Sequence, residues 1–128
     1  MSKKFADYIP AIVIAGIILF LGILPGENLE AAGLGKESYH INGHFLFFSA
    51  LCFLLYRPLR NIPYCVLVTI AYGVLIELIQ IFVPARAASL FDVFTDTMGA
   101  LISALILWKL QRYLPKILKN WLNPYPGN

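Results

Sequence analysis

Most of the chain falls into four long apolar stretches separated by short polar or proline-containing segments. The stretches cover residues 8–26, 38–56, 62–83 and 89–108. A helix needs about 20 mostly apolar residues to cross the roughly 30 Å hydrocarbon core of a bilayer. Pro84 directly follows the third stretch, where it should end a helix because proline donates no backbone hydrogen bond. The pattern predicts an all-α protein, an integral membrane bundle of four transmembrane helices.

Composition favours the same class of protein. Hydrophobic residues make up 59% of the 128 residues and charged residues only 13%, whereas about a quarter of the residues of a typical soluble domain are charged. An ordinary soluble domain is therefore excluded, and the length fits one membrane domain over residues 1–128. The basic start and first apolar stretch could also be a signal peptide, but no small-residue cleavage pattern follows Leu24, so a retained first span is expected.

Lysine and arginine are distributed unevenly between the two predicted sides of the membrane. One side holds Lys3, Lys4, Arg57, Arg60, Lys109, Arg112, Lys116 and Lys119, and the other holds Lys36 and Arg86. Cytoplasmic loops carry the excess of basic residues, so both termini are predicted to be cytoplasmic. The net charge of +3 follows from this asymmetry and gives no reason to expect a nucleic-acid partner.

The basic segment that follows the fourth stretch, residues 109–128, is amphipathic. It mixes four Lys or Arg residues with apolar and aromatic ones such as Tyr113 and Trp121. Such a segment is typical of a helix that lies on the surface of anionic lipid, here with a predicted break at Pro115. The alternative is a simple anchor for the fourth span, whose long basic side chains reach toward the headgroups.

Polar side chains interrupt the apolar stretches in the second half of the chain. An ionisable group in hydrocarbon costs several kcal/mol, so such residues usually face the interior of a bundle and mark a binding or transport site. We predict that ligand-binding residues here are His44, Glu77, Gln80, Arg86, Ser89, Asp92 and Asp96. If the protein is an enzyme, the candidate catalytic groups among them are His44, Glu77, Asp92 and Asp96.

Depth along the predicted helices brings four of these residues together. Asp96 and His44 each lie 13 residues from the basic residue that borders their span, and Asp92 and Glu77 each lie 17 residues from theirs. At about 1.5 Å per residue, the first pair lies roughly 20 Å and the second roughly 26 Å above the inner border. Two tiers in the outer third of the membrane are predicted.

The spacing along the fourth stretch predicts a polar stripe on one helical face. Asp92, Asp96, Gly99 and Ser103 are separated by four, three and four residues, which places them on the same side of a helix. Small residues allow membrane helices to approach closely. We expect the third and fourth spans to pack along this stripe, where Gly73 of the third span allows close approach. His44 on the second span should close the polar cluster from the other side.

Each polar residue also has a structural interpretation. Asp92 stands three residues after Ser89, the spacing of a capping box at the start of a helix. Glu77 and Gln80 could stabilise helix packing through interhelical hydrogen bonds, and His44 could lie at the wet interface.

Charge balance narrows the chemistry of the cluster. Three carboxylates face one nearby cation, Arg86, and the excess negative charge requires a bound proton, a protonated His44 or a cationic or hydrogen-bonding ligand. His and carboxylates can bind a divalent ion, but their spacing matches no specific metal motif. No metal site and no cofactor are predicted.

Four short motifs resemble, in their order, those of the VanZ-like family. They read GHF at 43–45, ELIQ at 77–80, PARAASLFD at 84–92 and DTMG at 96–99. The resemblance covers about residues 41–105 and the preceding span. It implies a small multi-pass protein of the bacterial cytoplasmic membrane, related to a founding member that confers low-level resistance to teicoplanin. The characteristic polar positions of the family map onto His44, Glu77, Gln80, Arg86, Asp92 and Gly99.

The chain departs from the family pattern at two places. Asp96 stands where the family often has Asn, and His40 and Ile41 stand where it has an Asp-Lys pair. The site should therefore be more acidic than in its relatives.

The leading hypothesis is binding of a lipid or lipid-linked envelope component at the outer leaflet, which would alter lipoglycopeptide susceptibility. Arg86 would hold a phosphate or carboxylate. The partners would be membrane lipids, and a lipid-linked envelope precursor or a lipoglycopeptide. One alternative is a membrane-embedded enzyme that acts on a lipid headgroup, with His44 or an acid as general base. Another is a small proton-coupled exporter, although transport sites usually lie nearer the midplane.

Overall fold

The computed structural model describes residues 3–33 and 37–122, and every regular element in these ranges is a helix. The helices are α1 (Lys3–Ala6), α2 (Ile9–Ile23), α3 (Gly26–Ala31), α4 (Glu37–Leu59), α5 (Ile62–Gln80), α6 (Leu90–Tyr113) and α7 (Pro115–Leu122). Outside what the structure describes lie Lys36, the last six residues of the predicted tail, and the side chains of Lys3, Lys4 and residues 37–41. The predicted all-α class is confirmed for the described residues.

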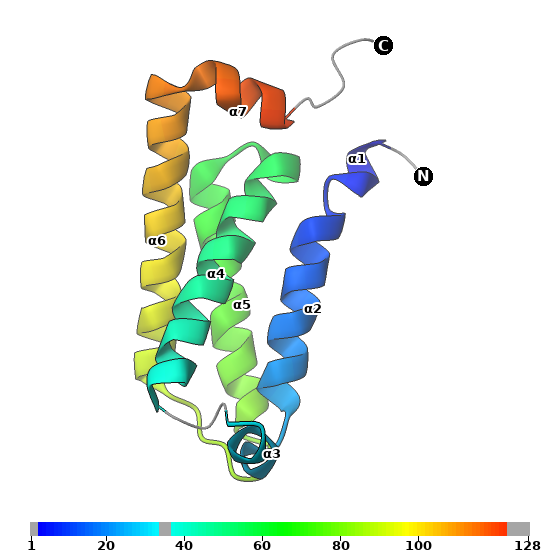
Figure 1. Cartoon of the computed structure of the whole chain (residues 1–128), viewed down its shortest axis with the longest axis vertical. Helices are drawn as coiled ribbons and strands as arrows, with labels where there is room; N and C mark the ends of the chain where they lie inside the picture. The colour runs from blue at the N-terminus through cyan, green and yellow to red at the C-terminus, as the bar shows by residue number, and fades with distance from the viewer. Residues whose placement is uncertain (1–2, 34–36, 123–128) are drawn as a thin grey trace.

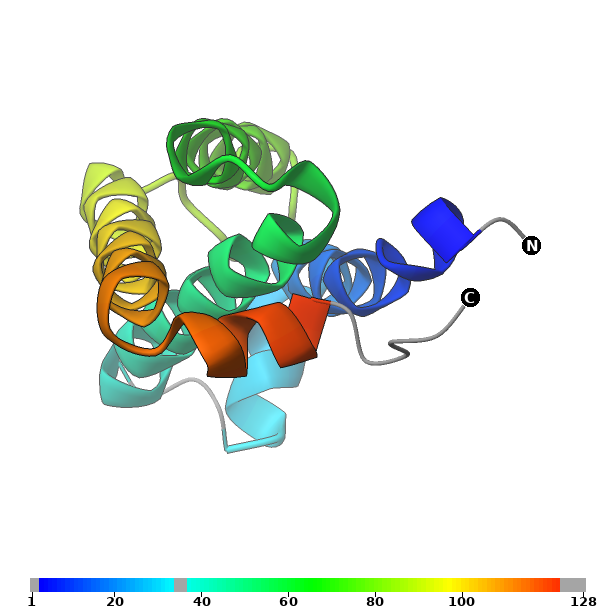
Figure 2. The ribbon, with the colours of Figure 1, turned by 90° about the horizontal axis from the view of Figure 1, so that it is seen from above.

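The four long helices run side by side, and the short helices lie at their ends (Figure 1). Helix α4 contacts α2, α5 and α6, and it lies in the middle of the bundle in the end-on view (Figure 2). Helices α1 and α7 lie at one end and α3 at the other (Figure 1). The α4–α5 turn is also at the α1 and α7 end, so the described basic residues of the predicted cytoplasmic side gather there.

Capping residues define where α5 and α6 begin. Asn61 precedes α5, and its side chain accepts a hydrogen bond from the backbone N–H of Tyr64. Ser89 precedes α6 and accepts in the same way from the N–H of Asp92. Both residue types are favoured at this position because their side chains satisfy backbone donors that the first helical turn leaves unpaired.

Several helix boundaries differ from the predicted spans. Helix α4 continues through residues 57–59, and α6 continues five residues beyond the predicted end at Trp108. Helix α5 ends at Gln80, before the predicted end at residue 83. Lys109 and Arg112 are good helix formers, so α6 continues through them. The first charged residue after an apolar stretch therefore does not mark the end of the helix.

Two of the four predicted spans are long and apolar enough to cross a membrane by length and composition. These are α5, with 19 residues, and α6, with 24 residues. Helix α2 is apolar but has only 15 residues. Helix α4 has 23 residues, but Glu37, His40, Asn42 and Arg57 make it less apolar. The prediction of four transmembrane helices is therefore supported for two of them only.

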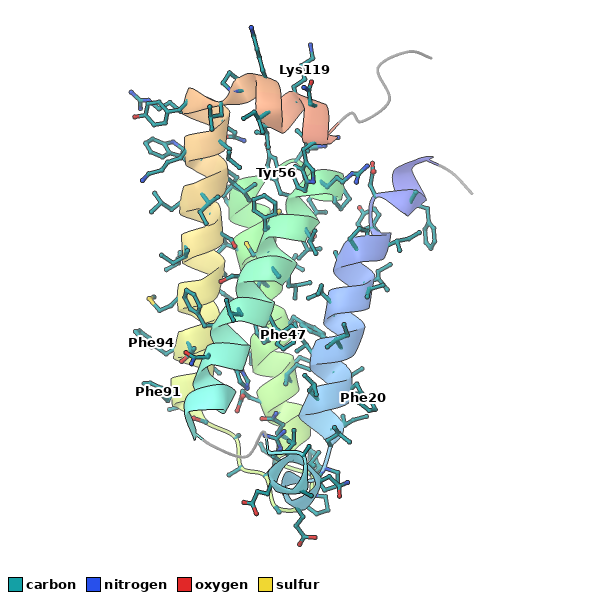
Figure 3. All side chains as sticks on the ribbon, viewed as in Figure 1. Phe20, Phe47, Tyr56, Phe91, Phe94 and Lys119 are labelled. Carbon is teal, nitrogen blue, oxygen red and sulfur yellow. The ribbon has the colours of Figure 1, made fainter. Side chains whose placement is uncertain are left out.

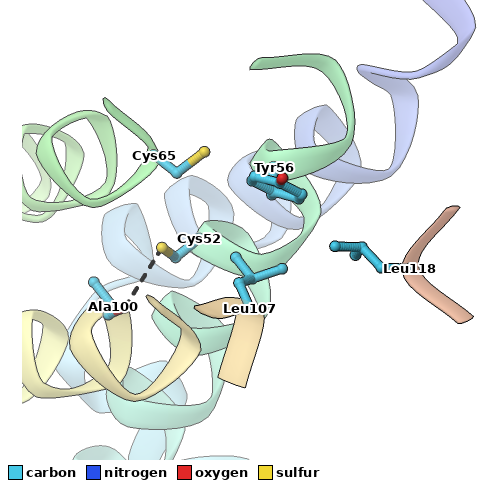
Figure 4. Packing of buried hydrophobic residues seen from close by; sticks show 6 residues of the cluster. All are labelled: Cys52, Tyr56, Cys65, Ala100, Leu107 and Leu118. Atoms are coloured by element: carbon cyan, nitrogen blue, oxygen red, sulfur yellow. Dashed lines mark hydrogen bonds between the residues drawn. The ribbon is translucent and has the colours of Figure 1, made fainter. Parts of the chain in front are cut away.

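The interior contains two clusters of buried apolar side chains. One lies near the α7 end and contains Cys52, Tyr56, Cys65, Ala100, Leu107 and Leu118 (Figure 4). Both cysteines are free thiols, and the Cys52 thiol donates to the carbonyl of Ala100. The other cluster joins α2 to α4 and α5 through Ala11, Ile18, Phe48, Leu51 and Ile76.

Large apolar side chains also cover the outside of the bundle. Phe20, Phe91 and Phe94 are more than half exposed and point away from the helices (Figure 3). Exposed apolar surface of this extent is unusual for a monomeric soluble protein, and it suits contact with lipid.

Helix α7 lies across the end of the bundle (Figure 2). It begins at Pro115, which agrees with the predicted break in the tail. Leu118 is buried, and the ring of Trp121 packs on that of Phe53 with centroids 5.0 Å apart. Lys119 points outward from the same helix (Figure 3), so α7 has an apolar face on the bundle and a basic face away from it.

Candidate functional site

His44 and Asp96 connect α4 to α6 at the end of the bundle that is opposite α7. The Nδ1 atom of His44 lies 2.9 Å from Oδ1 of Asp96. The Asp96 side chain is 1% exposed and that of His44 12%. Gly73 of α5 provides the space, because a Cβ atom there would lie 2.8 Å from Oδ2 of Asp96.

Glu77 connects the end of α5 to the start of α6. Its Oε2 atom accepts a 2.6 Å hydrogen bond from the backbone N–H of Ser89. In a capping box this donor is bound by the acid three residues later in the same helix, which here would be Asp92. Here Glu77 of the neighbouring helix α5 accepts from the Ser89 N–H in place of Asp92. The Ser89 hydroxyl oxygen in turn accepts from the N–H of Asp92.

The functional groups of three residues meet at one point. One ligand atom from each of His44, Glu77 and Asp92 lies within 4.8 Å of the other two. Glu77 is 4% exposed and Asp92 7%. Oε1 of Glu77 and Oδ2 of Asp96 are buried without a hydrogen-bond partner in the described part of the chain. A buried carboxylate oxygen in this state is costly, so the geometry favours a cation or a hydrogen-bond donor there.

Arg86 lies in the loop between α5 and α6 and reaches the end of α2. Its Nε and Nη2 atoms donate to the carbonyls of Leu24 and Leu21 at 3.3 and 3.0 Å. Cationic groups are favourable beside the last carbonyls of a helix. Burial lowers the pKa of Arg86, whereas Asp92 and Glu77 act in the opposite direction, and the guanidinium stays positively charged.

The backbone around Arg86 is held close to the α2–α3 junction. Ala85 has a φ of 56°, in the left-handed region that residues other than glycine rarely adopt. The N–H of Gly26 donates to the carbonyl of Pro84 at 3.2 Å, and a Cβ atom at residue 26 would collide with the carbonyl oxygen of Ala85. Gly26 is needed for this close approach.

A cavity of about 220 Å³ lies beside the cluster, between α2, α4 and α5. Most of its wall is apolar, from residues such as Ile18, Phe47 and Ile76, and the polar side chains in its wall are His44, Gln80 and Arg86. Of these, Gln80 is almost completely buried, at 2% exposed. The apolar wall of the cavity was not predicted, because apolar residues that line a cavity cannot be distinguished from core residues in the sequence.

The structure brings the predicted site residues together. The pairing of His44 with Asp96 and of Glu77 with Asp92, expected from their depths, is confirmed. Ser89 is also in contact with this group through Glu77, and Gln80 and Arg86 reach it through the cavity wall that they share with His44.

The predicted packing along the α6 stripe is partly wrong. Asp96 does face α5 at Gly73, but Gly99 and Ser103 face α4 instead. A Cβ atom at Gly99 would lie 2.6 Å from the carbonyl oxygen of Phe45, and the Ser103 hydroxyl donates to the carbonyl of Ser49. Small residues permit close approach to either neighbour, and α6 contacts α4 more extensively than α5.

A family model described as VanZ/LLP1 matches residues 9–112. The chain belongs to the VanZ/LLP1 family. The match extends from the start of α2 almost to the end of α6 and includes all members of the polar cluster. No curated protein and no solved structure matches the chain. Membership of the VanZ/LLP1 family and the two apolar helices agree with a membrane protein.

The arrangement in this VanZ/LLP1 chain suits binding more directly than covalent catalysis. The Ser89 hydroxyl, the one alcohol among the predicted site residues, is engaged in capping α6. The acids and His44 offer hydrogen-bond acceptors and metal-ligating atoms, and Arg86 offers positive charge beside an apolar cavity.

Proposed function

We propose that this protein binds a lipid or a lipid-linked component of the bacterial envelope. The polar part of the molecule would contact Arg86, Gln80 and the acidic cluster, and its hydrocarbon part would enter the neighbouring cavity. Binding would alter the envelope and, as in the founding member of the family, susceptibility to teicoplanin-type lipoglycopeptides.

The observation that carries this proposal is the cavity between α2, α4 and α5. Ligand pockets are commonly apolar with a few polar groups that fix orientation, and this cavity combines an apolar wall with His44, Gln80 and Arg86. A volume of about 220 Å³ suits part of an acyl or isoprenoid chain. The remainder would lie against the exposed apolar surface of the helices.

The polar groups match the chemistry of a lipid headgroup. Arg86 supplies a planar cation that suits phosphate. Gln80 can donate to and accept from hydroxyl groups, and the carboxylates accept from hydroxyl or amine groups.

The same proposal includes a multi-pass topology with both termini in the cytoplasm. The described basic residues away from Arg86 gather at the α1 and α7 end (Figure 1), which the positive-inside rule assigns to the cytoplasm. Helices α2 and α4 would cross with α5 and α6, because all four are packed together. The cluster and the cavity would then lie in the outer leaflet.

The test is co-purification of lipid with a variant whose cavity is filled. A Cβ atom at Gly43, in the cavity wall, meets no atom within 4 Å, so Gly43→Leu should fill space without collision. Gly16→Leu is the matched control, because Gly16 is equally open but is not part of that wall. Native mass spectrometry after extraction in minimal detergent would measure the bound lipid.

We expect the wild type and Gly16→Leu to retain the same lipid in equal amount, and Gly43→Leu to retain at least about ten-fold less of it, because its affinity for the lipid falls by at least that factor. Equal retention by all three proteins, or no retained lipid in any, would contradict the proposal.

A further inference from the structure

We propose that His44, Glu77 and Asp92 bind one divalent transition-metal ion of the zinc class. One nitrogen and two carboxylate oxygens from three helical segments lie within 4.8 Å of one another. Ligand atoms at about 2.0–2.2 Å from a tetrahedral Zn²⁺ are roughly 3.3–3.6 Å apart. Side-chain movements of about 1 Å therefore suffice to close the site. This inference goes beyond lipid binding and does not depend on it.

The burial of Glu77 is an independent observation that points to a cation. Its Oε2 atom accepts from Ser89, but Oε1 has no hydrogen-bond partner in the described residues although the residue is only 4% exposed. A buried charge must be paired or coordinate a metal. A cation placed between Glu77 and Asp92 would provide that partner and reduce the repulsion between the two acids.

Asp96 completes a second layer around the site. Its Oδ1 atom lies 2.9 Å from Nδ1 of His44, which assigns the other ring nitrogen, Nε2, to the ion. Histidines that bind metals nearly always donate their second N–H to a carboxylate, a carbonyl or a water, and this contact fixes the tautomer and the ring orientation. Asp96 is thus a positioning residue, and the absence of a side chain at Gly73 leaves room for it.

The type of ligand indicates the type of ion. A nitrogen and two oxygens suit zinc and similar divalent ions. Calcium takes six to eight oxygen ligands and magnesium an octahedral shell of oxygens, for which imidazole is a poor match. Three protein ligands leave a fourth position of a tetrahedral ion open, as in catalytic rather than structural zinc sites.

The experiment uses the whole chain in lipid nanodiscs, stripped with a chelator and then dialysed against Zn²⁺ or Co²⁺. Elemental analysis should find about one ion per chain, and Co²⁺ should give visible absorption typical of a site with mixed nitrogen and oxygen ligands. Glu77→Gln and Asp92→Asn, which keep the size of each side chain, should lose affinity by at least about ten-fold. Asp96→Asn should lose about 10- to 100-fold as a second-layer change.

Two controls separate the site from general acidity and from lipid binding. Glu27→Gln removes an exposed acid on α3 and should leave the stoichiometry and affinity unchanged. Gly43→Leu should lose lipid but keep the ion. A metal content below about 0.1 ion per chain in the wild type would overturn the proposal without bearing on lipid retention. Unchanged affinity in both Glu77→Gln and Asp92→Asn would also overturn it, and the Co²⁺ spectrum of the wild type tests the ligand set even if a variant fails to fold.

Discussion

Ser89 at the start of α6 donates its backbone N–H to Oε2 of Glu77 in α5 at 2.6 Å. The acidic cluster is therefore part of the N-terminal cap of α6. The second oxygen of this carboxylate, Oε1, is buried and has no hydrogen-bond partner among the described residues. One oxygen of Glu77 thus serves the fold, and the other is the one that the proposed cation would bind.

This division predicts different outcomes for two replacements of Glu77. Glu77→Gln keeps an oxygen that can accept from Ser89, so the free energy of unfolding should change by less than about 1 kcal/mol. Glu77→Leu removes the acceptor of that part-buried N–H, and an unsatisfied donor typically costs roughly 1–3 kcal/mol. Thermal unfolding of both variants in the same detergent would measure the difference. Equal melting temperatures would show that the Ser89 contact contributes little.

Gly73 should tolerate substitution poorly, because Asp96 occupies the space beside it. A Cβ atom at Gly73 would lie 2.8 Å from Oδ2 of Asp96 and 3.3 Å from the Phe48 ring. We expect Gly73→Ala to destabilise the protein by about 1–3 kcal/mol through overpacking. The control is Gly43→Ala, where Cβ meets nothing within 4 Å and the gain in helix propensity should raise stability by up to about 1 kcal/mol. If both variants unfold at the same temperature, α5 and α6 are not packed as closely as described.

Much of the cluster could be predicted because charged residues are rare in apolar sequence. His44, Glu77, Asp92 and Asp96 stand out from their neighbours, and a constant rise per residue places them at two depths. Depth along a helix depends only on residue number, so it could be calculated before the helices were assembled.

The orientation of each helix about its axis was harder to predict. Gly99 and Ser103 could face either neighbour, since small residues permit close approach without selecting a partner. Their contacts with α4 depend on where α4 lies in the bundle. Glu77 caps α6 from another helix, so this role also depends on a tertiary contact. The spacing of Ser89 and Asp92 had instead indicated a capping box formed within α6 itself.

Arg86 was expected to bind a ligand, but it also has a structural role. The cation is on the side of the acids, as predicted, but it also donates to the carbonyls of Leu21 and Leu24. The sequence of α2 has no feature that indicates these contacts, because every helix ends with unpaired carbonyls.

The proposed topology predicts that the two ends of the bundle react on opposite sides of the membrane. In a background with Cys52 and Cys65 replaced by Ala, a cysteine introduced at exposed Ala87 should be labelled by an impermeant maleimide added outside intact cells. A cysteine at Lys119, which is exposed at the opposite end, should react only after the membrane is opened. The reverse pattern would overturn the assignment of the termini to the cytoplasm.

Arg86→Ala should lower both stability and function. It removes the donors to Leu21 and Leu24 and leaves two carbonyls at the end of α2 without this partner, so we expect a loss of roughly 1–3 kcal/mol in unfolding free energy and reduced membrane abundance. Arg86→Lys keeps the charge but lacks the planar fork, and should recover part of the abundance. Unfolding in detergent and quantitative immunoblotting of membranes would measure both effects. Wild-type abundance and melting temperature in Arg86→Ala would contradict a structural role for the guanidinium.

Glu77→Gln and Asp96→Asn separate ligand binding from scaffolding in cells. Both keep side-chain size and hydrogen bonding, and both remove a carboxylate from surroundings that disfavour charge, so folding and membrane abundance should be preserved. If the cluster binds an envelope component, Glu77→Gln should abolish any effect of the chain on teicoplanin susceptibility at unchanged abundance, and Asp96→Asn should weaken that effect less because its contact is with His44. Susceptibility and abundance must be measured in the same cultures. A phenotype that declines only in proportion to abundance would identify the cluster as a structural element of the bundle, because a scaffold acts only through the amount of folded protein.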